Sequence, residues 1–205
     1  MPQINTLIFD FGDVFINLDK QGAMDNALQL FGLIEFEDDM LKTNIAYEIG
    51  AISTLEFLAF YQKKFPNLNQ DEIVYAWNYI IRDFPEHRLK FIQNLKASGQ
   101  YQLILLSNTN ALHIQYIKNN VPFYEEFKRC FDVFYLSHEI RLRKPNADIY
   151  KFVLNENHLN PEECLFIDDT KDNTDMAERL GLHTWNIDET LEDVADVFKV
   201  KSDLF

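Results

Sequence analysis

The chain has 205 residues, of which 47% are hydrophobic and 25% are charged, and its formal net charge at pH 7 is −14. This composition is typical of a globular protein and excludes a disordered chain, a collagen-like fibre and a coiled coil. The acidic balance makes nucleic acid and anionic membrane surfaces poor partners, because such a chain repels polyanions.

Targeting signals and disulfide patterns are missing from the sequence. The residues before the first apolar run contain no basic segment followed by an apolar one, as a signal peptide would. No apolar run reaches the roughly 18 residues that a membrane-spanning helix needs. Cys130 and Cys164 are far apart and fit no CxxC or zinc-ligand pattern. We therefore expect a cytoplasmic protein without disulfides.

Short apolar runs of the kind that form buried parallel strands recur along the chain. They lie at residues 4–9, 101–106, 133–136, 164–167 and 183–187. Helical patterns follow the later runs, at residues 111–119, 147–155, 172–180 and 189–198, and the third of these ends at Gly181, a good helix stop. Strands that alternate with helices predict an α/β fold with a doubly wound parallel sheet.

The stretch after the first strand breaks this alternation. Apolar residues at helical spacing occur at residues 20–31, 37–48, 53–65 and 70–82. Ser53 and Glu56 have the spacing of a capping box at the start of the third segment. We therefore predict a helical cap at residues 18–84, inserted into a Rossmann-like core formed by residues 1–17 and 85–205.

Four polar motifs follow predicted strands. They are Asp10-Phe11-Gly12-Asp13, Ser107-Asn108-Thr109-Asn110, Lys144-Pro145 and Asp168-Asp169. Each alone has an ordinary structural explanation as a turn, a helix cap or a solvated charge. Together they indicate a site, because open α/β sheets bind ligands at the carboxyl ends of their strands.

The residue types in these motifs suit phosphoryl chemistry with a hard cation. Asp10 and Asp169 can supply carboxylates to Mg²⁺, and the Gly12 carbonyl can supply a third oxygen. Lys144, the Ser107 hydroxyl and backbone N–H groups from Asn108 onward can hold a phosphate, since they precede a helix. Asp10 is placed to attack phosphorus and form an aspartyl-phosphate.

In order and type, these residues resemble the four motifs of the haloacid dehalogenase-like hydrolase superfamily. The nucleophile is Asp10, Ser107 is the second motif, Lys144 the third, and Asp168-Asp169 the fourth, with Asp168 behind the metal ligands. Longer stretches, FDFGDVF, YLSHEIRLRKPNADIY and FIDDTKDNTDMAERLGL, resemble the bacterial alpha-D-glucose-1-phosphate phosphatase branch. The resemblance implies a Mg²⁺-dependent phosphatase that acts on a small phosphorylated metabolite, such as a sugar phosphate.

Two positions depart from the superfamily pattern. Most of its phosphatases carry an Asp two residues after the nucleophile, which protonates the leaving group, but this chain has Gly12. Asp13 is the next residue, but one step along the chain turns the side chain elsewhere, so the acid role is not transferred to it. Arg141 stands where relatives often have Gly, so we expect a different loop shape at residues 139–143.

Two alternatives to a phosphatase remain open from the sequence. A 2-haloacid dehalogenase uses the same nucleophile on carbon without a metal, and the Asp168-Asp169 pair argues against it. A non-catalytic protein that binds a phosphorylated ligand is favoured only by Gly12. The cap is expected to select the substrate, and its candidate residues are Asp19, Asn44, Tyr47, Glu48, Trp77 and Asn78. His87 and His113 are weaker candidates for a general acid.

Overall fold

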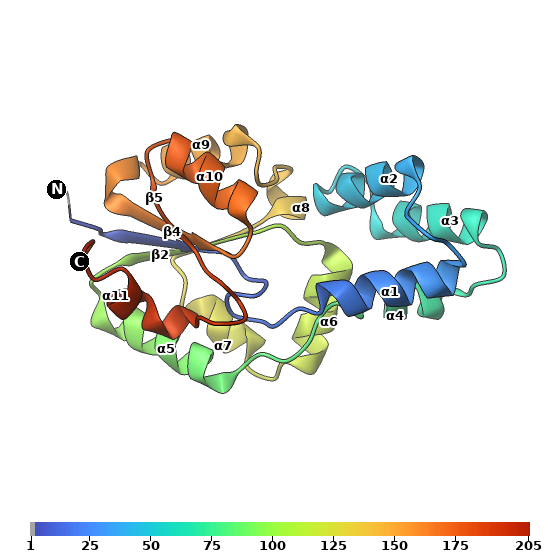
Figure 1. The fold of residues 1–205 in the computed structure, drawn as a ribbon, viewed down its shortest axis with the longest axis horizontal. Helices are drawn as coiled ribbons and strands as arrows, with labels where there is room; N and C mark the ends of the chain where they lie inside the picture. Colours follow the sequence, from blue (N-terminus) through green and yellow to red (C-terminus); the bar gives the residue numbers. More distant parts are fainter. Residues whose placement is uncertain (1–2) are drawn as a thin grey trace.

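The chain folds into an α/β core and a helical cap in the computed structural model, which describes residues 3–205 (Figure 1). Five parallel strands form one sheet in the order β3-β2-β1-β4-β5. The strands are β1 (Thr6–Phe9), β2 (Gln102–Ser107), β3 (Val133–Leu136), β4 (Cys164–Asp168) and β5 (His183–Asn186). The predicted doubly wound α/β sheet is confirmed.

Helices cover both faces of the sheet (Figure 1). One face packs against α5 (Glu86–Ser98), α6 (Ala111–Asn120), α7 (Tyr124–Arg129) and α11 (Val197–Val200). The other packs against α9 (Ala147–Glu156) and α10 (Lys171–Arg179). Strand side chains alternate between the faces, so Leu7 and Phe9 join the first layer and Ile8 joins the second. This two-sided burial explains why the central strands are apolar throughout.

The cap lies beside the sheet and has a hydrophobic core of its own (Figure 1). Its helices are α1 (Lys20–Phe31), α2 (Asp38–Glu48), α3 (Thr54–Lys64) and α4 (Gln70–Asn78). They pack around Met40, Phe57, Tyr61 and Ile73, all at most 2% exposed. The predicted capping box of Ser53 and Glu56 is present at the start of α3. The outer bounds of the cap, residues 18 and 84, stay a prediction.

The fourth cap helix is shorter than the sequence pattern predicts, and that prediction was wrong at its end. Helix α4 stops at Asn78 rather than continuing to Arg82. The backbone of residues 80–83 instead bonds the segment that leads out of the core. The Asp19 amide donates to the Ile80 carbonyl at 2.8 Å, and the Asn17 amide donates to the Asp83 carbonyl at 2.9 Å. These bonds tie together the two chain crossings between cap and core.

The predicted helix at residues 189–198 was also wrong. The chain there forms a turn, a short 3₁₀ helix (Val194–Asp196) and the single turn of α11. Two aspartates interrupt it, because Asp188 accepts from the Thr190 amide and Asp193 accepts from the Ala195 amide. Sequence analysis missed α5, α7, the short α8 (Ser137–Ile140) and a second 3₁₀ helix (Pro161–Glu163).

Candidate active site

Three strand ends in the middle of the sheet bring the predicted polar side chains together. Asp10 directly follows β1, Ser107 ends β2, Asp168 ends β4 and Asp169 comes next. Strand β1 lies between β2 and β4, with Phe9 opposite Leu105 on one side and Ile167 on the other. Asp10 therefore has the hydroxyl-bearing strand on one flank and the acidic pair on the other.

Lys144 reaches the same place from the loop that precedes α9. Its side chain is fully buried, and its Nζ lies 2.8 Å from Asp10 Oδ1 and 2.6 Å from Asp168 Oδ2. Asn108 holds the Lys144 backbone: its Nδ2 donates to the Lys144 carbonyl, and its Oδ1 accepts from the Lys144 amide, both at 2.9 Å. The Asn108 side chain is thus engaged, and its backbone N–H remains the expected phosphate donor.

Asp168 is completely buried and both of its oxygens accept hydrogen bonds. The Thr170 amide donates at 2.8 Å, and Asn173 Nδ2 donates to both oxygens at 3.0 Å. Because these bonds fix the carboxylate, Asp168 in turn fixes the ammonium of Lys144. This arrangement suits a supporting role behind the metal ligands, as the sequence predicts.

The surroundings of Asp10 disfavour its ionised form. Burial, opposed by Lys144 and aided by the charges of Asp168 and Asp169, raises the pKa of Asp10 to about 7. A nucleophilic carboxylate must be ionised, so Asp10 needs more positive charge than Lys144 alone supplies. A cation beside Asp10 would favour the ionised form.

The donor atoms around Asp10 fit a hard divalent cation. Carboxylate oxygens of Asp10, Asp168 and Asp169 lie within 4.8 Å of one another. Mg²⁺ prefers such oxygens and usually keeps several waters. Because both oxygens of Asp168 are hydrogen-bonded, Asp10 and Asp169 are the residues that would hold the ion. The Gly12 carbonyl as a third ligand stays a prediction.

Asp13 is occupied in the turn that follows β1. Its backbone is left-handed, with φ of +53°. One carboxylate oxygen accepts from the Leu18 amide at 2.8 Å, and the other lies 2.7 Å from Lys20 Nζ. Asp13 therefore stabilises this turn and the start of α1, in agreement with not assigning it the acid role.

The place of the missing acid is filled by a leucine. A Cβ atom built at Gly12 would lie 2.6 Å from Leu18 Cδ1. Contacts of this length do not occur in proteins, so a side chain at position 12 requires Leu18 to move. The Cδ1 atom is at the far end of the flexible Leu18 side chain, so a change of its rotamer could relieve the clash.

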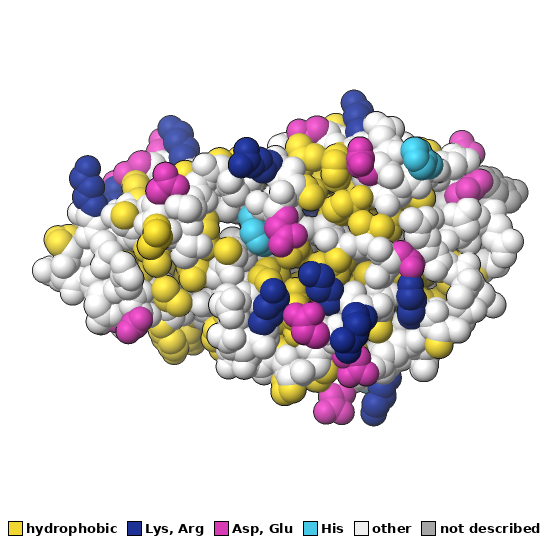
Figure 2. Space-filling view, turned by 180° about the vertical axis from the view of Figure 1, so that it is seen from behind, with side chains coloured by type: hydrophobic (Ala, Val, Ile, Leu, Met, Phe, Trp, Pro, Cys, Tyr) yellow, Lys and Arg dark blue, Asp and Glu magenta, His cyan; other side chains and the backbone are white. Residues whose placement is uncertain are grey.

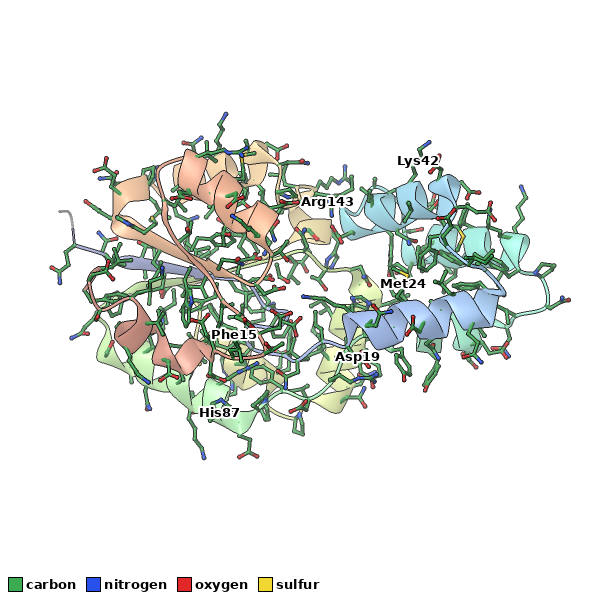
Figure 3. All side chains as sticks on the ribbon, viewed as in Figure 1. Phe15, Asp19, Met24, Lys42, His87 and Arg143 are labelled. Carbon is green, nitrogen blue, oxygen red and sulfur yellow. The ribbon has the colours of Figure 1, made fainter. Side chains whose placement is uncertain are left out.

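A cavity of about 300 Å³ lies between the cap and the core beside this site. The core contributes Gly12, Ser107, Asn108, Asn110 and His113 to its wall, among others. From the cap, three of the predicted specificity residues line it: Asn44, Glu48 and Trp77. Glu48 is paired with Arg143 Nε at 2.7 Å, and Arg143 extends from the core toward the end of α2 (Figure 3).

The other three predicted cap residues have different surroundings. Asp19 caps α1 through the Gly22 amide and pairs with Arg82 (Figure 3). The Tyr47 hydroxyl accepts from the Leu112 amide at 3.1 Å and so joins cap to core. Asn78 is buried and lines a separate pocket together with Tyr75 and Arg82. None of the three lines the cavity beside Gly12, because helix packing within the cap directs them elsewhere.

The chain matches a family of known proteins over most of its length. The family model for haloacid dehalogenase-like hydrolases matches residues 4–181. The chain belongs to the haloacid dehalogenase-like hydrolase family. The predicted family and the predicted enzyme class, a hydrolase, are both confirmed.

Several relatives of this haloacid dehalogenase-like hydrolase are known. A D-ribitol-5-phosphate phosphatase of Bacteroides thetaiotaomicron is 29% identical over 195 residues, which cover 89% of this chain and 91% of that one. A haloacid dehalogenase family enzyme from the same organism, solved with magnesium, is 31% identical with a TM-score of 0.83, covering 96% and 98% of the two chains. A hydrolase of this type from Porphyromonas gingivalis is 27% identical with a TM-score of 0.81, covering 98% of each chain.

These relatives agree with the Mg²⁺ cofactor that the sequence predicts. The Bacteroides enzyme was also solved with magnesium and inorganic phosphate together. An L-2-haloacid dehalogenase has a TM-score of 0.61 at 17% identity, which shows a shared fold only. In the described part of this hydrolase no helix has the length and apolar character to cross a membrane. On the face in Figure 2, basic side chains stand next to acidic ones, so that face carries no separate basic patch.

Neither candidate histidine is arranged as an acid for this hydrolase. His87 is exposed on α5, where its Nε2 lies 2.9 Å from Asp193, away from the strand ends (Figure 3). His113 lines the cavity, but burial lowers its pKa to about 4, although its bond to the Trp77 carbonyl opposes this. With Nε2 donating to that carbonyl at 3.0 Å, Nδ1 can accept from Asn110 at 3.1 Å. The ring is therefore held neutral.

Sequence analysis missed three residues of the site. Asn173 holds Asp168, Arg143 pairs with Glu48, and Lys20 lies 2.6 Å from Asp169. Asn173 was detectable, since it lies one helical turn beyond the Asp168-Asp169 motif and on the inner side of α10. Lys20 and Arg143 gave no signal, because surface-type residues at a helix start or in a loop are common.

Proposed function

We propose that this protein is a Mg²⁺-dependent phosphatase that hydrolyses a small phosphomonoester through an aspartyl-phosphate on Asp10. The proposal rests on the groups that surround the Asp10 carboxylate. Asp10 lies 2.8 Å from the fully buried ammonium of Lys144 and within 4.8 Å of an oxygen of Asp169. A single carboxylate between a phosphate-binding lysine and a metal-binding aspartate is what nucleophilic attack on a phosphate requires.

The chain's own residues divide the reaction between them. Bound Mg²⁺ supplies positive charge to the phosphate oxygens and to the ionised carboxylates. Lys144, the Ser107 hydroxyl and the N–H groups at the start of α6 hold the remaining phosphate oxygens. An Asp10 oxygen attacks phosphorus while the bond to the leaving oxygen breaks, and the departing alkoxide takes a proton from water to become the alcohol. Water then attacks the same phosphorus, which releases inorganic phosphate and restores Asp10.

The cavity indicates an uncharged leaving group. Among its lining residues the only one with a formal charge is Glu48, and Arg143 already neutralises it. A second phosphate or carboxylate on the substrate would find no cation there and would face Glu48. These features favour a sugar or polyol phosphate, and the D-ribitol-5-phosphate phosphatase among the relatives has a substrate of that kind.

The position of the ester bond is a separate question. Gly12 leaves the chain without the usual acid, and an anomeric oxygen leaves more easily than a simple alkoxide. This favours a sugar-1-phosphate on chemical grounds, whereas the curated relative is named for a 5-phosphate. Comparing sugar-1-phosphates with polyol and sugar phosphates esterified at a primary alcohol will decide between them.

The test is a panel of phosphomonoesters assayed with Mg²⁺ and with a chelator. We expect release of inorganic phosphate from neutral sugar or polyol phosphates, little from bisphosphates, and none after chelation. Asp169→Asn should remove the same activity, because it leaves the ion one side-chain ligand. Chloride release from a 2-chloro acid without metal would support the dehalogenase alternative and contradict the proposal.

A further inference from the structure

Within residues 3–205, Lys20 is the one lysine of the cap helices that forms an ion pair with a proposed metal ligand, Asp169. Its Nζ lies 2.6 Å from Asp169 Oδ2 and 2.7 Å from Asp13 Oδ2. Both carboxylates are nearly buried, with side chains 7% exposed, whereas the Lys20 side chain is 49% exposed. Lys20 is also the first residue of α1, so these contacts join the base of the cap to the loops after β1 and β4.

The charges around the strand ends explain why this contact matters. Asp169 belongs to two carboxylate clusters, one with Asp10 and Asp168 and the other with Asp13 and Glu189. Lys144 is fixed between Asp10 and Asp168, so it leaves Asp13 and Asp169 to another partner. Lys20 is that partner. A cation bound by Asp10 and Asp169 would share the Asp169 carboxylate with the Lys20 ammonium, and the two positive groups would repel each other.

We propose that Lys20 is a positioning residue that holds Asp169 and sets the affinity of the site for Mg²⁺. The inference rests on the proposed function, since it takes Asp169 as a ligand of that ion. The single charge of Lys20 partly compensates Asp13 and Asp169, and it thereby lowers the electrostatic gain that Mg²⁺ obtains from the Asp169 carboxylate. Removing the ammonium should tighten Mg²⁺ binding and destabilise the metal-depleted protein, because both effects arise from the same uncompensated charge.

The experiment compares Lys20→Met with the wild type by titrating Mg²⁺ in a calorimeter and by measuring Tm with and without the ion. Met keeps most of the apolar stem and removes the charge. We expect about tenfold tighter Mg²⁺ binding in Lys20→Met, the size of effect of one partly screened charge near a divalent ion. We also expect a lower Tm after chelation and a larger rise in Tm on adding Mg²⁺.

Two further variants separate this role from a general loss of charge or structure. Lys20→Arg keeps the charge and should bind Mg²⁺ with an affinity within about threefold of the wild type, as the pair is only partly screened. Lys171→Met is the matched control, because Lys171 begins α10 two residues after Asp169 but pairs with Asp175. That variant should leave both the Mg²⁺ affinity and the Tm shift unchanged.

The outcomes distinguish this inference from the proposed function beneath it. Wild-type protein that binds Mg²⁺, together with a Lys20→Met variant that binds it equally or more weakly, would overturn the role of Lys20 and leave the phosphatase proposal standing. The same holds if Lys171→Met tightens binding as much as Lys20→Met does. A wild type that binds no Mg²⁺ would overturn the metal site and this inference together.

Discussion

The core and the cap of this hydrolase use their polar residues in opposite ways. In the core, polar side chains at the strand ends face one another, and Asp10, Lys144 and Asp168 form a buried ionic cluster. In the cap, several polar groups hold helices together, as when the Tyr61 hydroxyl donates to Asn44 at 2.7 Å. The candidate catalytic groups therefore lie in the core, while the cap supplies one wall of the cavity.

The packing of the two regions differs in the same sense. The sheet buries aliphatic strands on both faces, so strand ends are fixed in place to either side of Asp10. Aromatic rings pack in both regions, with Phe15 and Phe127 at 4.9 Å in the core and Tyr47 and Phe57 stacked at 4.3 Å in the cap. The core adds hydrogen-bonded strands to this packing, and rigid strand ends suit a site that must place atoms accurately.

The largest expected effect is on kcat and tests whether Asp10 in the core is the nucleophile. Asp10→Asn should lower kcat by at least about 10⁴-fold, because an amide cannot form the acyl-phosphate. The fold should survive, since Asn has the same size and Lys144 keeps its bond to Asp168. Turnover and Tm are measured beside Asp203→Asn, an exposed control. A variant that retains wild-type rates would show that the nucleophile lies elsewhere.

The second prediction concerns the border between core and cap at Gly12. Without an acid there, the rate should depend steeply on the leaving group in a series of aryl and alkyl phosphates. The double variant Gly12→Asp with Leu18→Ala makes room for the new carboxyl, since Leu18 Cδ1 occupies that space. It should speed alkyl phosphates by about 10²-fold and aryl phosphates little, because only poor leaving groups need the proton.

The control for this experiment is Leu18→Ala alone, which should keep the steep dependence of the wild type. A wild-type slope near zero, under conditions where chemistry limits the rate, would mean that another group already donates the proton. If that group lies in the cap, the catalytic groups would not belong to the core alone.

The third prediction uses His113, where the core meets the cap at Trp77. Its pKa is about 4 in the folded protein and 6.5 ordinarily, so the unfolded chain binds the extra proton between these values. The free energy of unfolding should therefore be fully retained above pH 6.5 and fall by roughly 3 kcal/mol as the pH drops to 4. Urea titrations at several pH values measure this.

In His113→Gln this acid-dependent loss should be smaller, because no ring remains to be protonated. His87→Gln, in which an exposed ring is replaced, serves as the control and should keep the wild-type dependence. An identical fall in stability for wild type and His113→Gln would show that other groups cause the acid sensitivity. Protonation of His113 would then not weaken the contact between core and cap.

The smallest expected effect lies in the loop before Lys144. Arg141 has the left-handed backbone conformation that glycine favours, with φ of +58°. Arg141 thus has a backbone conformation that glycine could also adopt, and the different loop shape at residues 139–143 stays a prediction. Arg141→Gly should raise the free energy of unfolding by up to about 1 kcal/mol, since relief of strain exceeds the entropy that glycine adds to the unfolded chain. Denaturant midpoints measure the change, and a destabilised variant would contradict this account.

Much of the core could be predicted from the sequence, for a physical reason. Parallel strands expose their carboxyl ends at one edge, so Asp10, Ser107 and Asp168 had to meet once the strands were recognised. The cap could be predicted only as helices. Whether Asn44 or Asn78 lines the cavity depends on how helices rotate against one another, which periodicity does not specify. The contact of Lys20 with Asp169 joins residues 149 positions apart and leaves no local pattern.

The two chain crossings between cap and core determine where the cap could be exchanged. Residues 17 and 83 are hydrogen-bonded to each other, so the chain leaves the core and returns to it at the same point. The inserted segment therefore interrupts no strand of the sheet. A cap from a relative grafted at these two positions would have to replace the contacts that Lys20, Tyr47 and Glu48 make with the core.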